Sequence, residues 1–232
     1  MFHDDQHGTA IVTLAALINA LQVVDKPLSQ VRVALSGAGA AGAAIARLLL
    51  REGVGDLVVA DRDGILTDDR DHDPTRTFLC EHSNREGRTG TLADAVRGAD
   101  VFIGVSAPDV IGEAELRSMA DDAVVFAMAN PDPEVDPALA RQHAAVVATG
   151  RSDEPNQINN VLVFPGVFRG LLDARARDVT LDTEVAAAHA LAAVVRPEQL
   201  RPTYIVPSVF NERVVTAVAD AVRFAAHETA PS

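Results

Sequence analysis

The first residues of the chain hold a dense group of side chains that can do chemistry. The stretch "HDDQHGT" contains His3, the adjacent carboxylates Asp4 and Asp5, and His7. Histidines and carboxylates are the groups that most often exchange protons in enzyme sites. An acidic pair beside a chain terminus can equally be a solvated surface feature. The residues themselves leave both interpretations open.

A glycine-rich stretch is the second candidate site, because "GAGAAG" follows an apolar run and precedes a helical pattern. In a dinucleotide-binding turn, the first glycine permits the tight turn, the second lets a pyrophosphate approach the backbone, and the third lets the helix close on the sheet. The phosphates would lie at the helix N-terminus, whose free N–H groups and dipole favour anions. A purely structural glycine turn is the alternative. The residues expected to line the dinucleotide are Gly37, Ala38, Gly39, Ala40, Ala41 and Gly42.

The end of the next apolar run favours the dinucleotide interpretation. Asp61 closes the run at 56–61, where an acidic residue would bind the ribose hydroxyls. Its charge would repel a 2′-phosphate, which favours NAD over NADP. Arg62 follows directly and could instead bind such a phosphate, so the sequence leaves NADP open.

The spacing of apolar residues predicts alternating strands and helices. Near-continuous apolar runs predict strands at 31–35, 56–61, 100–105, within 123–134 and at 144–151. Helical spacing predicts helices at 9–23, from about 40 to Gly53, from Leu92 to the 100–105 strand, at 184–195 and at 211–227, the last with Asn211 as N-cap. Residues 62–90 are predicted to be irregular, with a solvated loop at 68–73. The alternation indicates an α/β fold, a doubly wound parallel sheet of the Rossmann type with flanking N- and C-terminal helices.

No repeat, low-complexity segment or change of composition divides the chain. We therefore expect residues 1–232 to form a single dinucleotide-binding domain. Within it, residues 1–27 form a leading segment and helix, 28–180 the Rossmann core, and 181–232 the C-terminal helices. The helix at 9–23 is apolar on most sides, so it is either buried or packed against a partner.

Charge and composition exclude several classes of partner. The chain has 232 residues and a net charge of −13, which disfavours nucleic acids and anionic membranes. No apolar run is long enough to span a membrane, and no signal peptide is recognisable. The single cysteine, Cys80, rules out an internal disulfide and is typical of a reducing compartment. We therefore expect a cytoplasmic location.

Polar residues that follow the predicted strands are further candidates. Ser106 follows the strand at 100–105, and Asn130 and the pair Asn159 and Asn160 lie in loops further along the chain. Each also has a structural interpretation, as a turn residue before Pro131 for Asn130, loop caps for the pair, and a strand-end turn for Ser106.

Together these motifs resemble the bacterial malic enzymes. The stretches that carry the resemblance, in the same order and spacing over residues 2–227, are "FHDDQHGTAI", "GAGAAG", "DRDGIL", "FIGVSAPDVI", "ANPDPE" and "NQINNVLVFPGVFRGLLD". The first and last are highly specific to that family, whereas the glycine turn is not. The resemblance implies oxidative decarboxylation of malate to pyruvate and CO2, with NAD or NADP and Mg or Mn.

The resemblance also implies roles for individual residues. Asp5 is similar to a carboxylate ligand of the metal, and Asp4 to the neighbouring acid that hydrogen-bonds the catalytic lysine. Asn130 and Asn160 are similar to the amides that hold malate, and Asn159 to a cofactor contact. The other acidic metal ligands of the family lie upstream of the matching segment.

The family's base and acid, a lysine and a tyrosine, belong to an N-terminal domain ahead of the matching segment. Lys26 and Tyr204 are the only residues of their types here, and neither matches a catalytic position of the family. We therefore expect the chain alone to bind dinucleotide but not to turn over malate. Its expected partners are its own N-terminal domain, malate or pyruvate, and further copies of itself in a homo-oligomer.

Two other functions stay open. One is a stand-alone dinucleotide-binding module that performs no chemistry. The other is the cofactor domain of another amino-acid or hydroxy-acid dehydrogenase. The "HDDQHGT" stretch speaks against the second, because such enzymes need no metal-binding acid there.

Overall fold

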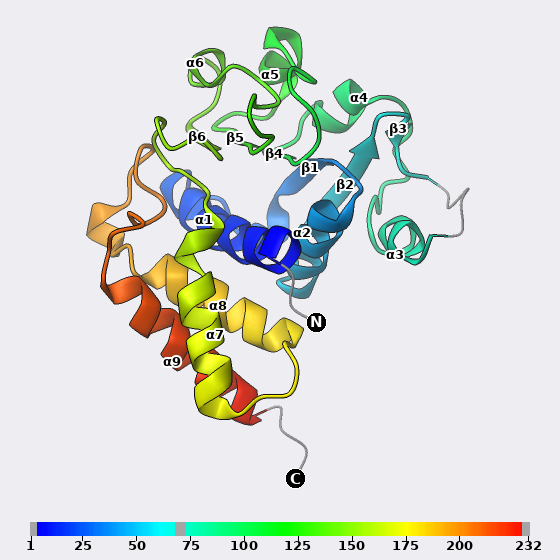
Figure 1. Ribbon diagram of the computed structural model, residues 1–232. Coiled ribbons are helices and arrows are strands. Elements are labelled where there is room, and N and C mark those ends of the chain that lie inside the picture. Colours follow the sequence, from blue (N-terminus) through cyan, green and yellow to red (C-terminus); the bar gives the residue numbers. More distant parts are fainter. Residues whose placement is uncertain (1–3, 68–72, 229–232) are drawn as a thin grey trace.

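The computed structural model describes residues 4–67 and 73–228 and contains a six-stranded sheet (Figure 1). The strand order is β3-β2-β1-β4-β5-β6, and every neighbouring pair is parallel except β2 and β3. The strands are β1 (Arg32–Ser36), β2 (Asp56–Asp61), β3 (Gly64–Ile65), β4 (Val101–Gly104), β5 (Val124–Ala127) and β6 (Val146–Thr149). The predicted doubly wound sheet is confirmed.

Helices cover both faces of this sheet. On one face lie α4 (Leu92–Val96), α5 (Glu113–Ser118) and α6 (Pro137–Ala140), drawn above the sheet in Figure 1. On the other lie α1 (Thr9–Val23) and α2 (Ala40–Arg51), with α8 (Leu181–Ala193) packed beneath them. Every residue of β4, β5 and β6 is buried. Burial on both faces explains why these strands are continuous apolar runs.

Helix α1 is the most deeply buried helix of the layer beneath the sheet. Ile11, Leu14 and Leu17 are at most 1% exposed, and the helix packs against α2 and α8. Of the two predicted explanations for its apolar surface, burial within the chain is therefore the observed one. Helix α1 gives no reason to expect self-association, and a homo-oligomer stays a prediction.

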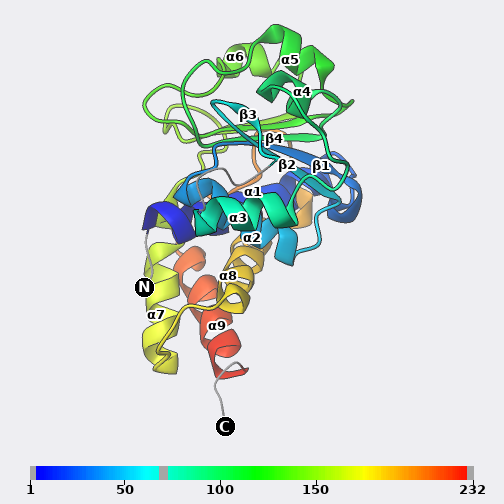
Figure 2. The same ribbon diagram turned by 90° about the vertical axis from the view of Figure 1, so that its right-hand side faces the viewer.

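The C-terminal part forms a group of helices below the sheet, as Figure 2 shows from the side. Helix α7 (Phe164–Ala174) packs against α9 (Arg213–Glu228), and α9 against α8. The contact with α9 uses glycines, because a Cβ on Gly166 would lie 2.6 Å from Val218 and one on Gly170 would lie 2.8 Å from Val222. Helix α7 thus lies within residues 28–180 but packs on a helix of residues 181–232.

Several elements differ from the sequence prediction. Residues 62–90 contain β3 and α3 (Pro74–His82), which packs against α2. The side chain of Asp73 accepts a hydrogen bond from the Thr75 N–H and so caps α3, while the rest of the predicted loop at 68–73 lies outside the described residues. The helices α5, α6 and α7 were not predicted. At α9, Asn211 does accept from the Arg213 N–H at 3.1 Å, as the predicted cap requires.

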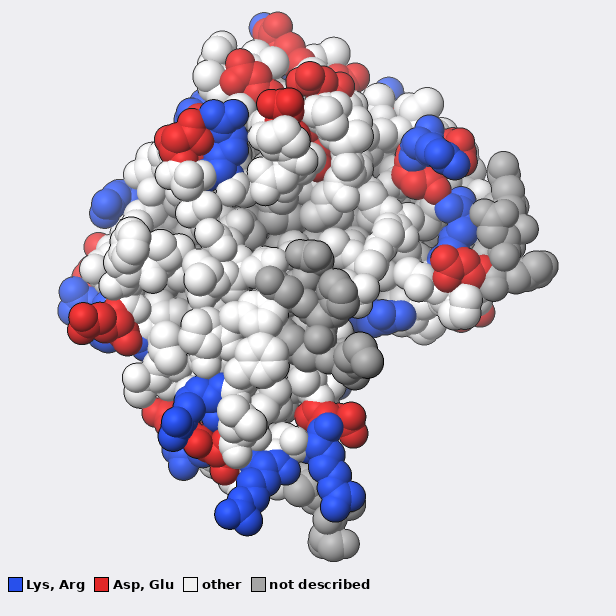
Figure 3. Space-filling model, in the orientation of Figure 1, with Lys and Arg blue, Asp and Glu red and all other residues white. Residues whose placement is uncertain are grey.

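None of the helices within the described residues is both long and apolar enough to cross a membrane. In the face drawn in Figure 3, most charged side chains of the described residues stand near the periphery. On α7, which crosses that face, Phe168 is 44% and Leu172 73% exposed.

Candidate functional site

The carboxyl ends of five parallel strands meet at one edge of the sheet. This edge is the usual ligand site of doubly wound folds. Two cavities open there. The first, called the Asp61 cavity, has a volume of about 380 Å³ and is lined by Ser36, Asp61, Arg62, Asp63, Gly64, Thr91, Leu92, Ser106, Ala107 and Val110. The second, called the Asn160 cavity, has a volume of about 350 Å³ and is lined by Thr9, Met128, Asn130, Gly150, Gln157, Ile158, Asn159 and Asn160.

The glycine turn between β1 and α2 has room for a ligand at one position only. Gly37 has a φ of 118°, and a Cβ on it would lie 2.8 Å from the carbonyl oxygen of Val105. A Cβ on Gly42 would overlap the carbonyl oxygen of Gly37. Nothing lies within 4 Å of a Cβ built on Gly39, the exposed N-cap of α2. The open space thus lies where a diphosphate would meet the helix N-terminus.

An ion pair holds the acidic residue at the end of β2. Arg76 of α3 donates to the Asp61 carboxylate at 2.6 Å, and the Asp63 N–H donates to it at 2.9 Å. Burial raises the pKa of the Asp61 carboxyl, but these hydrogen bonds and the positive charges of Arg76 and Arg62 outweigh it, so the net pKa lies below its usual value. Asp61 is therefore a fixed negative charge in the cavity wall, with Arg62 exposed beside it.

Ser106 lies in the same cavity and is joined to β1. Its hydroxyl is 2.8 Å from that of Ser36, the last residue of β1. The strand-end loop that follows β4 is thereby tied to the residue just before the glycine turn. Ser106 thus lies in the cavity wall where the sequence placed it, at the end of a buried strand.

The Asn160 cavity is assembled from distant segments. The hydroxyl of Thr9, the first residue of α1, donates to Oδ1 of Asn160 at 3.1 Å. Asn130 lines the same cavity from the loop after β5. Asn159 accepts from the Val161 N–H at 3.0 Å and caps a short 3-10 helix, Asn160–Leu162, so the loop-capping interpretation holds for its oxygen. Both asparagines of the pair nevertheless line the cavity.

A buried carboxylate lies beneath the loops that border both cavities. Glu134 is 0% exposed, and its two oxygens accept the N–H groups of Ser106 at 2.8 Å and Ala129 at 2.9 Å. Burial raises the pKa of the Glu134 carboxyl above its usual value, although those backbone N–H groups work in the opposite direction. Sequence reasoning assigned this residue no role.

The leading segment reaches the rest of the fold through a histidine. Residues Asp4–Gly8 form a short π-helix that runs directly into α1 and contacts α2. Nδ1 of His7 lies 2.5 Å from the carboxylate of Glu184 on α8, a side chain only 6% exposed. Burial raises the pKa of the Glu184 carboxyl, and His7 opposes that rise. His3 and the side chains of Asp4 and Asp5 lie outside the described part of the structure.

Comparison with known proteins identifies the chain. A family model described as "Malic enzyme, NAD binding domain" matches residues 6–227. The chain belongs to this family.

Individual relatives of this malic enzyme NAD-binding domain agree. The NAD-dependent malic enzyme of Geobacillus stearothermophilus is 51% identical over 99% of the chain and 48% of its own length. The NADP-dependent malic enzyme of Halomonas elongata is 44% identical over 97% of the chain and 57% of its own length. The crystal structure of the malic enzyme from Pyrococcus horikoshii superposes with a TM-score of 0.92 at 44% identity, covering 98% of this chain and 55% of that one. The chain thus spans about half the length of its relatives.

The malic enzyme domain brings its predicted residues together in two groups. Asp61, Arg62 and Ser106 line the Asp61 cavity, and Asn130, Asn159 and Asn160 line the Asn160 cavity. Sequence reasoning missed the residues that support them, namely Thr9, Ser36, Glu134 and Gln157. Thr9 and Glu134 lie inside the family stretches "FHDDQHGTAI" and "ANPDPE", which was the available signal.

The metal site that the malic enzyme resemblance implies is not supported by a cluster of ligand side chains. Among the described side chains, no group of three or more histidine, cysteine, aspartate or glutamate residues is placed to hold a metal ion. The assignment of Asp5 as a ligand therefore stays a prediction.

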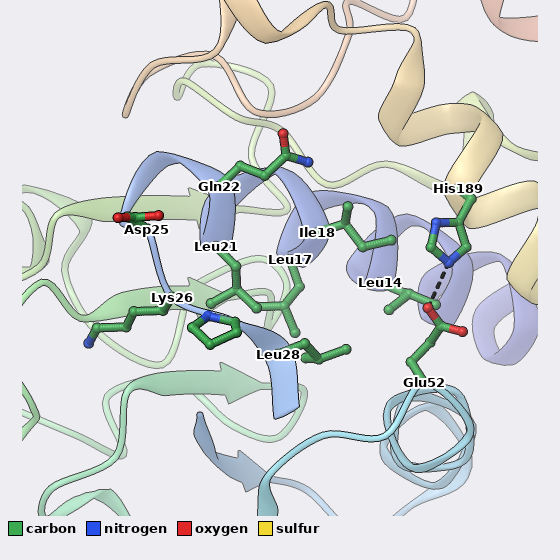
Figure 4. Close-up of a pocket in the computed structure, with 11 residues that line it drawn as sticks. Leu14, Leu17, Ile18, Leu21, Gln22, Asp25, Lys26, Leu28, Glu52 and His189 are labelled. Carbon is green, nitrogen blue, oxygen red and sulfur yellow. Dashed lines mark hydrogen bonds and ion pairs between the residues drawn. The ribbon is translucent and has the colours of Figure 1, made fainter. Parts of the chain in front are cut away.

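A third cavity of the domain lies away from these residues. It has a volume of about 600 Å³ and is shown in Figure 4. Leu17 and Leu21 extend from α1 toward Leu28, which precedes β1, so the cavity lies at the amino ends of the strands. His189 and Glu52 line its polar side, and Nε2 of His189 lies 2.6 Å from the carboxylate of Glu52. None of the predicted site residues lines it.

The single lysine also belongs to that remote cavity. The ammonium of Lys26 donates to the Asp100 carboxylate at 2.8 Å and to the carbonyl oxygen of Asp121 at 2.5 Å. Tyr204 lies beneath the guanidinium of Arg201, 5.2 Å from the ring centre. Neither residue lines the Asp61 or the Asn160 cavity.

Proposed function

We propose that this chain is the dinucleotide-binding part of an enzyme that oxidatively decarboxylates malate to pyruvate and CO2. The observation that carries the proposal is the open space at Gly39, between two glycines that leave no room for a side chain. This space lies at the N-terminus of α2, whose free N–H groups favour the negative charge of a diphosphate. Membership of the malic enzyme family supplies the reaction.

The glycine turn and the adjoining Asp61 cavity bind different parts of the dinucleotide. The backbone of Gly37, Gly39 and Gly42 cradles the diphosphate, and Asp61 binds the ribose hydroxyls. The low pKa of the Asp61 carboxyl keeps it ionised, which disfavours a 2′-phosphate and supports NAD as the preferred cofactor. Relatives include both NAD- and NADP-dependent enzymes. Arg62 lies where it would bind the 2′-phosphate in an NADP-using variant.

The residues of the Asn160 cavity bind the hydroxy acid. Asn130 and Asn160 offer neutral amides, which hold a carboxylate and a hydroxyl without exchanging protons with them. The hydroxyl of Thr9 fixes the Asn160 side chain at the cavity wall. Asn159 lines the same cavity and is proposed to contact the cofactor.

The bound nicotinamide supplies the hydride acceptor for C2 of malate. This chain orients the malate through Asn130 and Asn160, but its one lysine is bound to Asp100, away from the site. We propose that a further domain provides the lysine base and tyrosine acid, and that Asp4 supports that lysine. Asp5 would ligate the Mg or Mn that stabilises the enolate. The greater length of the relatives supports a further domain. We also propose that copies of the protein form a homo-oligomer.

A titration with NAD tests the proposal. We expect the unmodified chain to bind NAD in calorimetry, and Gly39→Val to weaken binding by at least about tenfold, because the side chain fills the space for the diphosphate. Gly112→Val is the matched control: Gly112 is also a helix N-cap with a negative φ, where a Cβ meets nothing closer than 3.5 Å. Equal NAD affinity in Gly39→Val and the unmodified chain would contradict the proposal.

A further inference from the structure

The further inference concerns Glu134, the buried carboxylate between the two cavities. It lies in the "ANPDPE" stretch and is 0% exposed. One oxygen accepts the N–H of Ser106 at 2.8 Å, and the other accepts the N–H of Ala129 at 2.9 Å. Ser106 lines the Asp61 cavity, and Ala129 directly precedes Asn130 of the Asn160 cavity. One side chain therefore joins the walls of both.

The fold makes room for this carboxylate at the end of β4. A Cβ on Gly104, the last residue of that strand, would overlap the Glu134 carboxylate. The backbone adds two further links between the same loops, since the Asp109 N–H donates to the Pro133 carbonyl at 3.2 Å and the Ile111 N–H to the Glu134 carbonyl at 3.3 Å. The loops after β4 and β5 thus form one connected unit with Glu134 at its centre.

The chemistry of the contact requires two acceptors. The Ser106 and Ala129 groups that donate to Glu134 are backbone N–H groups, and a donor that loses its acceptor in a dry interior destabilises that conformation. A carboxylate can accept on both oxygens. An amide of the same size has only one acceptor oxygen and would turn its own N–H₂ toward the other donor. This position therefore requires the two acceptor oxygens of a carboxylate, and a side chain of the same size and shape is not sufficient.

We propose that Glu134 is a positioning residue that holds the Ser106 and Asn130 loops in one geometry, so that dinucleotide and hydroxy acid are presented to each other at the correct spacing. This role rests on the proposed function of the two cavities. Glu134 contacts neither ligand and acts through the backbone of the loops. The geometry of the two cavities then depends on a residue that lines neither of them.

The test compares Glu134→Gln with the unmodified chain. Because Gln fills the same volume, a space-filling role predicts no change, whereas the loss of one acceptor predicts about tenfold weaker NAD binding. We also expect faster hydrogen exchange of the Ser106 or Ala129 amide, while the Ile103 amide inside β4 stays protected. Glu115→Gln is the matched control, because Glu115 also accepts a backbone N–H, that of Gly112, at 2.8 Å in the cap of α5.

A second variant guards against a folding defect in the first. Gly104→Ala displaces the same carboxylate without altering its chemistry, and we expect the same weaker NAD binding and the same local loss of amide protection. The thermal midpoints of all variants show whether each is folded. If Glu134→Gln fails to fold, the result for Gly104→Ala decides.

The outcomes separate this inference from the function on which it rests. If the unmodified chain does not bind NAD, the proposed function is wrong. If it binds NAD, and the folded Glu134→Gln and Gly104→Ala variants bind it equally well with unchanged exchange at Ser106 and Ala129, only the positioning role is overturned. Weaker binding with loss of protection confined to these amides supports the positioning role.

Discussion

The two cavities at the carboxyl edge of the sheet are built in different ways. The Asp61 cavity is lined by residues at the ends of β1 and β2, by β3, and by residues at the start of α4 and in the loop after β4. It adjoins the glycine turn, which is a backbone feature of one continuous unit, β1, the turn and α2. The Asn160 cavity depends on a hydrogen bond between residues 151 positions apart, Thr9 and Asn160, and on the loop that carries Asn130. The glycine turn is therefore formed by local structure, whereas the Asn160 cavity forms only when α1 and the loops after β5 and β6 have packed together.

The difference has a functional consequence. A turn made of backbone does not tolerate a Cβ at its packed positions, Gly37 and Gly42. A cavity made of side chains from distant segments responds to changes in any of them. Apart from Glu134, which joins the walls of both cavities, we therefore expect different substitutions to weaken dinucleotide binding and substrate binding.

The largest expected effect concerns turnover. A polypeptide of these 232 residues, assayed with malate, NAD and Mn, should be slower than a full-length relative by at least about 10⁴-fold. The reason is that a general base and a general acid each contribute about 10² or more, and Lys26 is bound to Asp100. Turnover at the rate of a full-length malic enzyme would show that the Asn160 side of the site is already complete.

A second prediction probes the backbone of the Asp61 side. Gly42→Ala should lower the free energy of unfolding by about 1–3 kcal/mol, because the new Cβ overlaps the Gly37 carbonyl. Gly39→Ala should change it by no more than about 0.5 kcal/mol, because that Cβ meets nothing within 4 Å. Urea unfolding of both variants measures the contrast. Equal destabilisation would mean that the turn is not packed as described.

A third prediction concerns cofactor choice. Asp61→Asn removes the charge that repels a 2′-phosphate and leaves Arg76 and Arg62 beside the site. The ratio of NADP to NAD affinity should rise by about tenfold. Arg151→Gln, which removes a charge from an exposed ion pair with Asp153, is the control. An unchanged ratio would place the 2′ position of the ribose away from Asp61.

The fourth prediction perturbs the Asn160 side alone. Thr9→Val keeps the shape of the side chain and removes its hydrogen bond to Asn160, so malate binding in the presence of NAD should weaken by about fivefold. NAD binding itself should not change. Thr77→Val, which removes a hydroxyl bond on the exposed side of α3, should alter neither. A loss of NAD affinity in Thr9→Val would show that the two cavities are not independent.

The smallest expected effects concern the pH dependence of the free energy of unfolding, to which Asp61 and Glu134 contribute with opposite signs. The pKa of Asp61 is lowered, so its contribution to stability is present above its unfolded pKa of about 3.9 and is lost as pH falls through the folded value. Burial raises the pKa of Glu134, so its contribution is present below about pH 4.3 and is lost as pH rises through the folded value.

Urea unfolding across this range, with Asp61→Asn and Glu134→Gln as references, measures the two slopes. The stability advantage of the unmodified chain over Asp61→Asn should shrink in acid. Its advantage over Glu134→Gln should shrink as the pH rises. Slopes of the same sign would contradict the assignment of these environments.

Local patterns allowed much of the fold to be predicted. The strands and the glycine turn follow from apolar runs and short spacings, which are properties of neighbouring residues. Helix α7 could not be predicted, because Pro165 and the glycines Gly166 and Gly170 argue against a helix in isolation. Those glycines are required by the close contact with α9, which is a tertiary fact. Helices α5 and α6 are too short to show a helical period.

The candidate site shows the same division. Asp61 was placed from its distance to the glycine turn, and the asparagines from the family resemblance. Thr9 and Glu134 were not assigned, because their partners lie in loops whose positions are set by packing. Sequence patterns readily indicate which side chains can contact a ligand. They are less informative about which residues hold those side chains in place.

Helix α1 connects the site with the far side of the domain. It begins at Thr9 in the Asn160 cavity, and its last turns line the remote cavity of Figure 4. Fifteen residues of α-helix form a rod about 22 Å long, and this one is enclosed by the sheet, α2 and α8. One buried helix therefore forms part of the wall of both cavities, and its packing against α2 and α8 holds Thr9 within hydrogen-bond distance of Asn160.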